Sequence, residues 1–327
     1  MTERRETGRP SRKASGTRPG SSGKPAAGTG PKTDAQWDAG GERIAKYLAR
    51  AGVASRRGIE RLIEAGDVSV NGQTLTSAAF KVTGRETIRV GRKTIKAPEA
   101  TRLWRYHKPS GLITTTDDPA GRRTVFQELP KSLPRVVTVG RLDLTTEGLL
   151  LLTNDGELAR FLELPKSGME RTYRVRAKGT VTAQKIEELA RGISVDGVAY
   201  QPIRAVFDRE MGANSWLTVT LTEGKKREVR RALESLGLMV NRLIRVSYGP
   251  FHLTDLKPGQ VEEIPTDILA QALAALSAPM APAAPPYTGP ALQPALQPAP
   301  QPAPKSHLGR EPRADRLKTK LKNPRRT

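Results

Sequence analysis

The stretch that decides the fold runs from residue 136 to residue 152 and begins Val-Val-Thr-Val-Gly-Arg-Leu-Asp at 136–143. Its β-branched start is typical of a strand, and the leucines at 149–152 predict a second strand after a short polar turn. Arg141 and Asp143 therefore lie on a loop between two strands. An arginine beside a carboxylate keeps it ionised, and such a carboxylate can be a nucleophile, a base, a metal ligand or only a turn residue. The loop alone does not choose among these roles.

Composition excludes several classes of protein. The chain of 327 residues has no cysteine, which rules out disulfides and thiolate metal sites, and only three histidines, which argues against a multi-histidine metal centre. We therefore expect no thiolate or multi-histidine metal site. No apolar stretch is long enough to span a membrane, and the basic N-terminus lacks the apolar segment of a secretory signal. The expected location is the cytoplasm.

The charge of the chain predicts a polyanionic partner. The net charge is +22, and residues 42–265 retain +12 when both ends are set aside. A basic tail alone could serve solubility. A basic core together with basic tails favours nucleic acid over a membrane surface.

Changes in composition predict the domain organisation. Residues 1–41 contain almost no apolar side chains, and residues 266–327 combine Pro/Ala/Leu/Gln repeats with a basic end. Neither segment can bury enough surface to offset the entropy of ordering, so we predict two disordered tails, with at most a short helix directly after Pro265. Between them we expect a domain over 42–91, a linker over 92–101 and a second domain over 102–265.

Two helices and a hairpin are predicted for the first domain. Ile44, Tyr47 and Leu48 have helical spacing, and Ser55 is a good N-cap for a second helix. The alternating Val-Ser-Val-Asn-Gly at 68–72 predicts a strand that enters a tight turn. Arginines directly after an N-cap are well placed for phosphate, although a solvated helix face would carry the same charges.

These segments carry a resemblance to a known family. Residues 43–57, Arg-Ile-Ala-Lys-Tyr-Leu-Ala-Arg-Ala-Gly-Val-Ala-Ser-Arg-Arg, together with 68–72, resemble an S4-type RNA-binding domain. The resemblance implies a small module that grips structured RNA through its phosphates. The residues expected to contact RNA in this module are Arg43, Lys46, Ser55, Arg56, Arg57 and Asn71.

The second domain is predicted to be α+β. Its sequence alternates several strand-like stretches with few helices, too few for a doubly wound parallel sheet. We expect a mixed, mostly antiparallel sheet with flanking helices.

The second domain resembles the pseudouridine synthases of the rRNA branch that carries an N-terminal S4 domain. Four motifs between residues 43 and 262 carry the resemblance: Lys-Pro-Ser-Gly at 108–111, Gly-Arg-Leu-Asp-Leu-Thr-Thr-Glu-Gly-Leu-Leu at 140–150, Glu-Arg-Thr-Tyr at 170–173 and Glu-Gly-Lys-Lys-Arg-Glu-Val-Arg-Arg at 223–231. Tyr106 before the first motif and Asp-Pro-Ala-Gly-Arg-Arg-Thr-Val-Phe at 118–126 are most similar to the enzymes that act on large-subunit rRNA.

The resemblance implies an isomerase that converts a uridine of rRNA to pseudouridine without a cofactor. Asp143 matches the catalytic aspartate, Arg230 an arginine that pairs with it, Tyr173 an aromatic residue that packs on the uracil, and Arg141 a helper near the pocket. Without the resemblance, Tyr173 would be a half-buried strand residue and Arg230 a solvated helix residue. Further RNA contacts are expected from Lys108, Lys225 and Arg227.

Three alternatives stay open at this stage. The protein could modify small-subunit rRNA, or it could be a non-enzymatic S4-type factor for ribosome assembly; a factor without activity would be expected to lack Asp143, Tyr173 or Arg230. A DNA-binding regulator is disfavoured, because the sequence shows no helix-turn-helix with a clear recognition helix. The expected partner is rRNA, free or in a precursor particle, bound by a monomer.

Overall fold

The structure, a computed structural model, describes residues 41–277. The tails predicted to be disordered lie outside these residues, apart from Gly41 and residues 266–277. Within the described part, no helix is long and apolar enough to cross a membrane.

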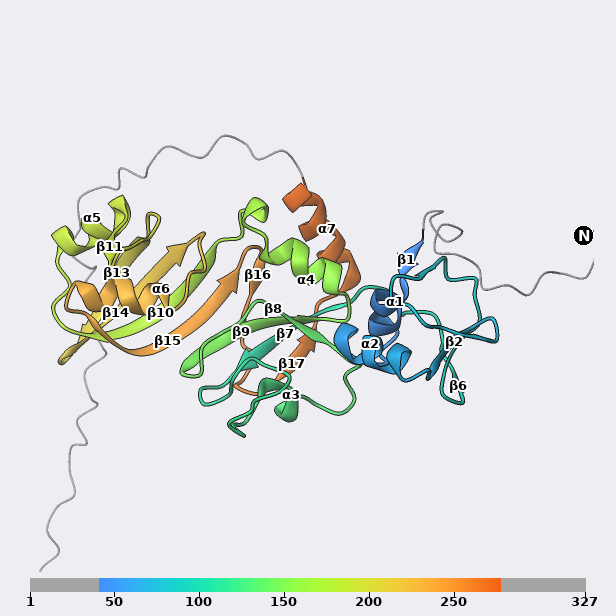
Figure 1. The fold of residues 1–327 in the computed structure, drawn as a ribbon. Coiled ribbons are helices and arrows are strands. Elements are labelled where there is room, and N and C mark those ends of the chain that lie inside the picture. The colour runs from blue at the N-terminus through green and yellow to red at the C-terminus, as the bar shows by residue number, and fades with distance from the viewer. Residues whose placement is uncertain (1–40, 278–327) are drawn as a thin grey trace, which may run out of the picture. The chain divides into compact units, whose positions relative to one another are not determined.

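The N-terminal domain consists of two helices and short strands around one small core (Figure 1). Its elements are β1 (Glu42–Arg43), α1 (Ile44–Arg50), α2 (Arg56–Glu64), β2 (Val68–Val70), β3 (Gln73–Thr74), β4 (Lys81–Val82), β5 (Ile88–Val90) and β6 (Lys93–Thr94). Ile44, Leu48 and Ile59 are fully buried in this core. The structure therefore has the two helices and the hairpin that the sequence predicts.

Local signals fix the ends of these elements. The Ser55 side chain caps α2 by accepting a hydrogen bond from the Gly58 N–H at 3.1 Å. Asn71 and Gly72 have φ values of 50° and 84°, which suits the tight turn between β2 and β3.

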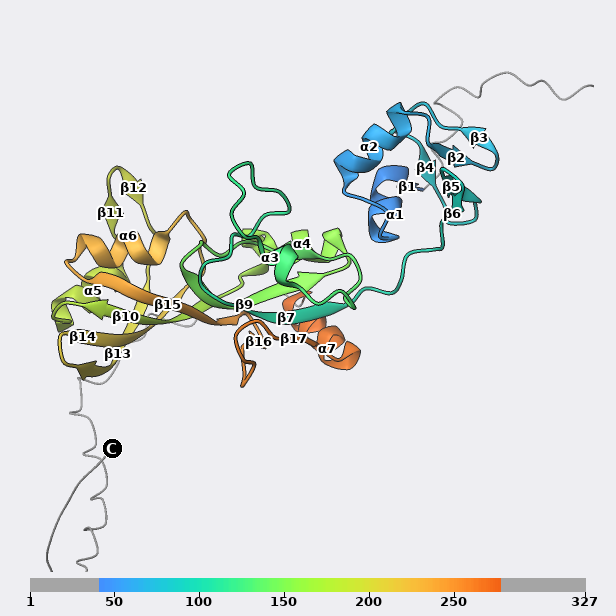
Figure 2. The same cartoon turned by 90° about the horizontal axis from the view of Figure 1, so that it is seen from below.

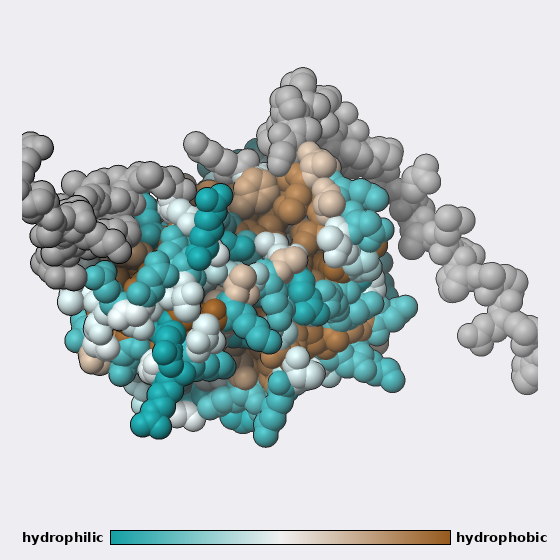
Figure 3. Space-filling view, turned by 90° about the vertical axis from the view of Figure 1, so that its right-hand side faces the viewer, coloured by the Kyte–Doolittle hydropathy of each residue, from teal (hydrophilic) through white to brown (hydrophobic). Residues whose placement is uncertain are grey.

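Figure 3 shows hydrophilic side chains over much of the face that it presents, with apolar side chains between them.

The second domain is built on a mixed sheet. Its strands are β7 (Leu103–Lys108), β8 (Val137–Val139), β9 (Thr146–Thr153), β10 (Arg171–Lys178), β13 (Arg204–Met211), β14 (Asn214–Leu221), β15 (Met239–Tyr248), β16 (Phe251–His252) and β17 (Val261–Glu263). The strand order is β13-β14-β10-β15-β9-β7-β17, with β8 beside β9 and β16 beside β15. Only β9 and β15 pair in parallel among the described strands of this sheet. The α+β prediction of a mixed, mostly antiparallel sheet is confirmed.

Helices cover both faces of this sheet (Figure 2). They are α3 (Val125–Glu128), α4 (Gly156–Glu163), a 3₁₀ turn at Pro165–Ser167, α5 (Ala183–Arg191), α6 (Glu228–Ser235) and α7 (Thr266–Ser277); β11 (Ser194–Val195) and β12 (Val198–Ala199) form a separate hairpin. The leucines of β9 point alternately to two cores. Leu150 and Leu152 pack in the core that includes α5 and α6, whereas Leu149 and Leu151 pack in the core that includes α4 and α7. A strand buried on both sides explains the continuous leucine run.

Helix α7 differs from the sequence-based expectation. Residues 266–327 were predicted to form a disordered tail with at most a short helix at its start, but α7 spans residues 266–277 and lies near α4 (Figure 1). Leu269 and Ala272 are buried against the core that also holds Leu158 and Leu162 of α4. The folded part of the second domain therefore extends past residue 265, because burial of this apolar helix face offsets the entropy of ordering it.

Gly148 allows the close parallel approach of β9 and β15. Its φ is +101°, and a Cβ at this position would lie 2.2 Å from the Arg245 carbonyl oxygen. Only glycine fits there. This contact joins the strand that follows the Asp143 loop to the strand that carries Arg245.

Candidate active site

The loop that carries Asp143 connects β8 to β9 and is held on both sides. The Gly140 N–H donates to Glu163 Oε1 at 2.7 Å, and the Thr114 hydroxyl donates to the Leu142 carbonyl at 2.9 Å. The Thr146 N–H closes the turn on the Asp143 carbonyl at 3.1 Å. These bonds fix the position of the half-buried Asp143 carboxylate.

Lys108 braces this loop from within the protein. Its side chain is fully buried, and Nζ donates to the carbonyl oxygens of Thr146 at 2.9 Å, Pro109 at 3.0 Å and Leu144 at 3.4 Å. Burial lowers the pKa of Lys108 to about 8, and the negative charges of Asp143 and Glu147 partly oppose this shift. Lys108 was expected to contact RNA; in the structure its ammonium group is buried and binds backbone oxygens.

Arg230 lies behind the same loop. It is 5% exposed, and its guanidinium donates to the Val240 carbonyl at 2.9 Å and to the Thr145 carbonyl at 3.3 Å. Burial lowers its pKa, and so does the charge of Arg227, while Asp143 favours the charged form. The described residues contain no direct Arg230–Asp143 ion pair, contrary to the expectation. Arg230 instead binds the backbone two residues after Asp143.

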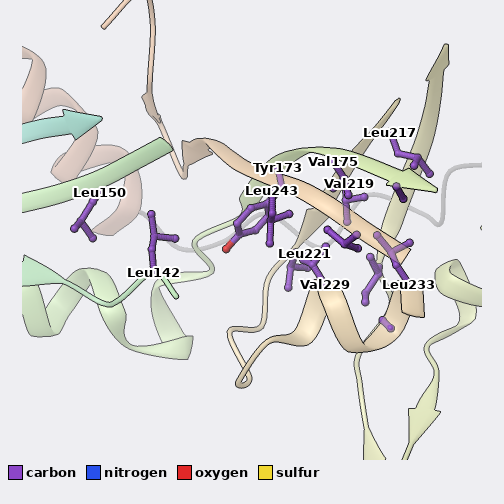
Figure 4. Close-up of a cluster of buried hydrophobic side chains, with 14 of the residues drawn as sticks. Leu142, Leu150, Tyr173, Val175, Leu217, Val219, Leu221, Val229, Leu233 and Leu243 are labelled. Carbon is purple, nitrogen blue, oxygen red and sulfur yellow. The ribbon is translucent and has the colours of Figure 1, made fainter. Parts of the chain in front are cut away.

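Tyr173 and Arg141 line the same pocket. The pocket has a volume of about 970 Å³ and is lined by Arg141, Asp143 and Tyr173, but not by Arg230. Tyr173 projects from β10, and its hydroxyl points toward Leu142 of the Asp143 loop (Figure 4). Arg141 is exposed. The fold thus brings an aromatic ring and a carboxylate that are far apart in sequence to one pocket.

Cationic side chains predominate around the pocket. Basic lining residues are Arg122, Arg141, Arg160, Arg171, Lys225, Lys226, Arg227 and Arg245, whereas the acidic ones are Asp117, Asp118, Asp143, Glu163 and Glu228. This excess of positive charge suits a phosphate-bearing ligand. No cluster of three or more metal-ligating side chains occurs within residues 41–277.

The turn before α6 forms one rim of the pocket. Lys225 and Arg227 are exposed there, as expected for RNA contacts. Lys225 also donates to the Ala199 carbonyl at 2.6 Å and pairs with Glu223 at 2.8 Å. Arg227 has a φ of +53°, a left-handed conformation that is uncommon for a residue with a side chain.

Glu228 holds this turn in place. It is 3% exposed, and its Oε2 accepts a hydrogen bond from the Lys225 N–H at 2.8 Å, while its buried Oε1 has no partner. Burial raises the pKa of Glu228 to about 7, against the opposing hydrogen bond from Lys225. Sequence reasoning did not single out Glu228.

The raised pKa of Glu228 predicts a pH-dependent stability. Between pH ~4.5 and ~7, Glu228 is protonated in the folded protein but ionised in the unfolded chain. The folding stability therefore falls as pH rises through this range. Glu228→Gln removes the charge and keeps the acceptor for Lys225. The native protein should lose stability between pH 5 and pH 8, whereas the variant should not. The difference in unfolding free energy between variant and native protein should therefore shift in favour of the variant by up to about 3 kcal/mol over this range. Urea unfolding at both pH values measures this difference, with exposed Glu234→Gln of the same helix as control; equal differences for both variants would contradict it.

The predicted RNA-binding residues of the N-terminal domain fall into two groups. Arg43, Arg56 and Arg57 are exposed and available to phosphate. The other three also serve structure: Ser55 caps α2, Lys46 pairs with Glu42 at 3.2 Å, and Asn71 Oδ1 accepts from the Thr87 N–H at 2.9 Å.

Comparison with known proteins identifies the class. The family model described as RNA pseudouridylate synthase matches residues 102–235, and the model of the S4 domain matches residues 42–88. The chain is 46% identical over 231 residues to an uncharacterized RNA pseudouridine synthase of Rickettsia prowazekii (strain Madrid E), a match that covers 71% of this chain and 97% of that protein. The chain belongs to the RNA pseudouridylate synthase family and carries an S4 domain; it is an isomerase that makes pseudouridine in RNA.

Two further relatives bear on the subgroup and on the fold. Ribosomal large subunit pseudouridine synthase B of Salmonella typhimurium is 47% identical over 220 residues, covering 65% of this chain and 75% of that protein. A solved structure described as pseudouridylate synthase matches with a TM-score of 0.50 at 25% identity, covering 70% of this chain and 99% of that one.

Proposed function

We propose that this protein isomerises a specific uridine of large-subunit rRNA, acting as a cytoplasmic monomer without a cofactor. The observation that carries the proposal is one pocket, rich in basic side chains, that is lined by both the braced Asp143 loop and Tyr173. The identity with a protein named for the large ribosomal subunit supports this substrate over small-subunit rRNA.

The reaction is an exchange of bonds within one nucleotide. The bond between uracil N1 and ribose C1′ breaks, the uracil turns, and a bond forms between C5 and C1′. N1 gains a proton and the hydrogen on C5 leaves to solvent, so the step needs no oxidant or reductant. The target base must first leave its stack, at a cost of a few kcal/mol.

Asp143 is the proposed catalytic group. Cleavage of a glycosidic bond builds positive charge at C1′, and an adjacent carboxylate can bond to this carbon or stabilise it. The same carboxylate could instead remove the proton from C2′ to give a glycal. Both routes require an ionised carboxylate.

The other site residues have proposed roles that follow from their positions. The Tyr173 ring stacks on the flipped uracil, which contributes roughly 1–3 kcal/mol. Arg141, exposed at the pocket mouth, braces the flipped-out nucleotide. Arg230 is a positioning residue, because it binds the Thr145 carbonyl of the catalytic loop. The exposed Arg43, Arg56, Arg57, Lys225 and Arg227 bind RNA phosphates.

Tritium release from rRNA labelled at C5 of uridine tests the proposal, because the C5 hydrogen must leave when C5 bonds to ribose. We expect release of about one tritium equivalent per large-subunit rRNA, free or in immature particles. Separately purified small-subunit rRNA serves as the control. Release from the small-subunit RNA alone would overturn the substrate assignment, and release from neither RNA would overturn the proposed function.

A further inference from the structure

Arg245 is a buried cation that lines the pocket and that sequence reasoning did not identify. It lies on β15 directly opposite Tyr173 of β10 in the antiparallel register. Side chains of directly opposed residues project to the same face of a sheet, so both residues face the pocket that they line. Arg245 is 3% exposed, which is rare for a charged side chain without a carboxylate partner.

The guanidinium of Arg245 is held in place and has unused donors. Its Nε donates to the Leu149 carbonyl at 2.7 Å, and its carbon lies 5.0 Å from the centre of the Tyr248 ring. One terminal nitrogen is buried and has no hydrogen-bond partner. A buried donor without a partner carries a free-energy cost, which a bound ligand can remove.

Arg171 provides an informative contrast. It stacks on the same Tyr248 ring at 4.9 Å and also lines the pocket. However, its terminal nitrogens donate to the carbonyls of Met169 and Thr222 and to the Tyr248 hydroxyl. Both terminal nitrogens of Arg171 therefore have acceptors in the protein, whereas a terminal nitrogen of Arg245 is buried and has none.

We propose that the terminal N–H groups of Arg245 bind O4 of the target uracil and so select uridine over cytidine. This inference rests on the proposed function, in which Tyr173, the cross-strand neighbour of Arg245, stacks on that base. A guanidinium only donates, and uracil presents carbonyl oxygens at C2 and C4. Cytosine has an amino group at C4, which would place a donor against a donor.

The proposed contact is compatible with rotation of the base. When uracil turns about the axis through N3 and C6 to bring C5 to ribose, O2 and O4 exchange places. A donor fixed beside one of these positions thus faces a carbonyl oxygen in both substrate and product. Arg245 can hold the base at both ends of the reaction without moving.

Sulfur substitution at the target base tests the inference, because sulfur accepts hydrogen bonds more weakly than oxygen. The substrates are three RNAs that carry uridine, 2-thiouridine or 4-thiouridine at the mapped target, and the product nucleoside is quantified by chromatography after digestion. We expect Arg245→Met to lower kcat/KM for uridine about 10–100-fold. The 4-thio substitution should slow the native enzyme but cause no further loss in Arg245→Met, whereas an effect confined to 2-thiouridine would overturn the inference.

Arg171→Met is the matched control, because it removes the neighbouring arginine from the same ring, and both terminal nitrogens of that arginine already have acceptors in the protein. This variant should lose as much kcat/KM on thio substitution as the native enzyme does. If Arg245→Met does not fold, Arg245→Lys replaces it. This variant should lose less kcat/KM on thio substitution than the native enzyme does. Equal thio penalties in the native enzyme and the Arg245 variant would overturn the inference while leaving the proposed function intact. Failure of the native enzyme on the uridine RNA would instead count against the proposed function.

Discussion

Asp143→Asn is expected to release no tritium from C5-labelled large-subunit rRNA, a loss on the order of 10³-fold or more. Asparagine keeps the size of the side chain and its place in the loop, since the bonds that fix this loop go to Gly140, Leu142 and the Asp143 carbonyl rather than to the carboxylate. It cannot, however, attack C1′ or accept the C2′ proton.

The same variant should bind RNA nearly as well as the native protein, because the exposed cations of the pocket rim and the S4 domain are untouched. Fluorescence anisotropy with labelled rRNA fragments measures this binding. Asp117→Asn is the matched control: Asp117 lines the same pocket on another loop, is exposed, and should retain activity. Turnover by Asp143→Asn would show that another group carries out the reaction.

Gly148→Ala is expected to cost about 3 kcal/mol or more of unfolding free energy. The added Cβ would overlap the Arg245 carbonyl at 2.2 Å, so the parallel pairing of β9 and β15 would have to open. The left-handed φ of +101° adds strain for any residue with a side chain. Denaturant unfolding measures the loss.

Gly212→Ala separates the two causes. Gly212 also has a positive φ, +59°, but an added Cβ there would meet no atom within 4 Å. This control should cost only about 1 kcal/mol. Equal losses at both positions would show that backbone strain, rather than the overlap, explains the effect.

Local patterns in the sequence predict most elements of the fold. The alternation in β2, the N-cap at Ser55 and the apolar run in β9 each depend on near neighbours, and the structure confirms them. The sequence allows a short helix after Pro265, but the packing of α7 onto the domain depends on distant contacts of Leu269 and Ala272 with the second core. A composition rich in alanine and proline does not reveal such contacts.

The candidate site was predictable only where a motif marks a residue. Asp143 and Tyr173 were found through motifs, and the structure places both at one pocket. The burial of Lys108 was not predictable, because lysine is almost never fully buried and two of its three backbone partners, Leu144 and Thr146, are distant in sequence. Arg245 carries no local signal that distinguishes it from other strand arginines. Its importance depends on which strand lies beside it.

The parallel pairing of β9 with β15 has a mechanical consequence. Among the described strands, this three-pair contact is what joins the two halves of the sheet, β13-β14-β10-β15 and β9-β7-β17. Asp143 belongs to the second half, whereas Tyr173 belongs to the first. The bidentate Arg242–Glu147 ion pair, with bonds of 2.8 and 3.0 Å, links the two paired strands. The hydrogen bond from Arg230 to the Thr145 carbonyl adds a second link between the two halves. The distance between the Asp143 carboxylate and the Tyr173 ring therefore depends on how rigidly the β9–β15 pairing holds the two halves of the sheet together.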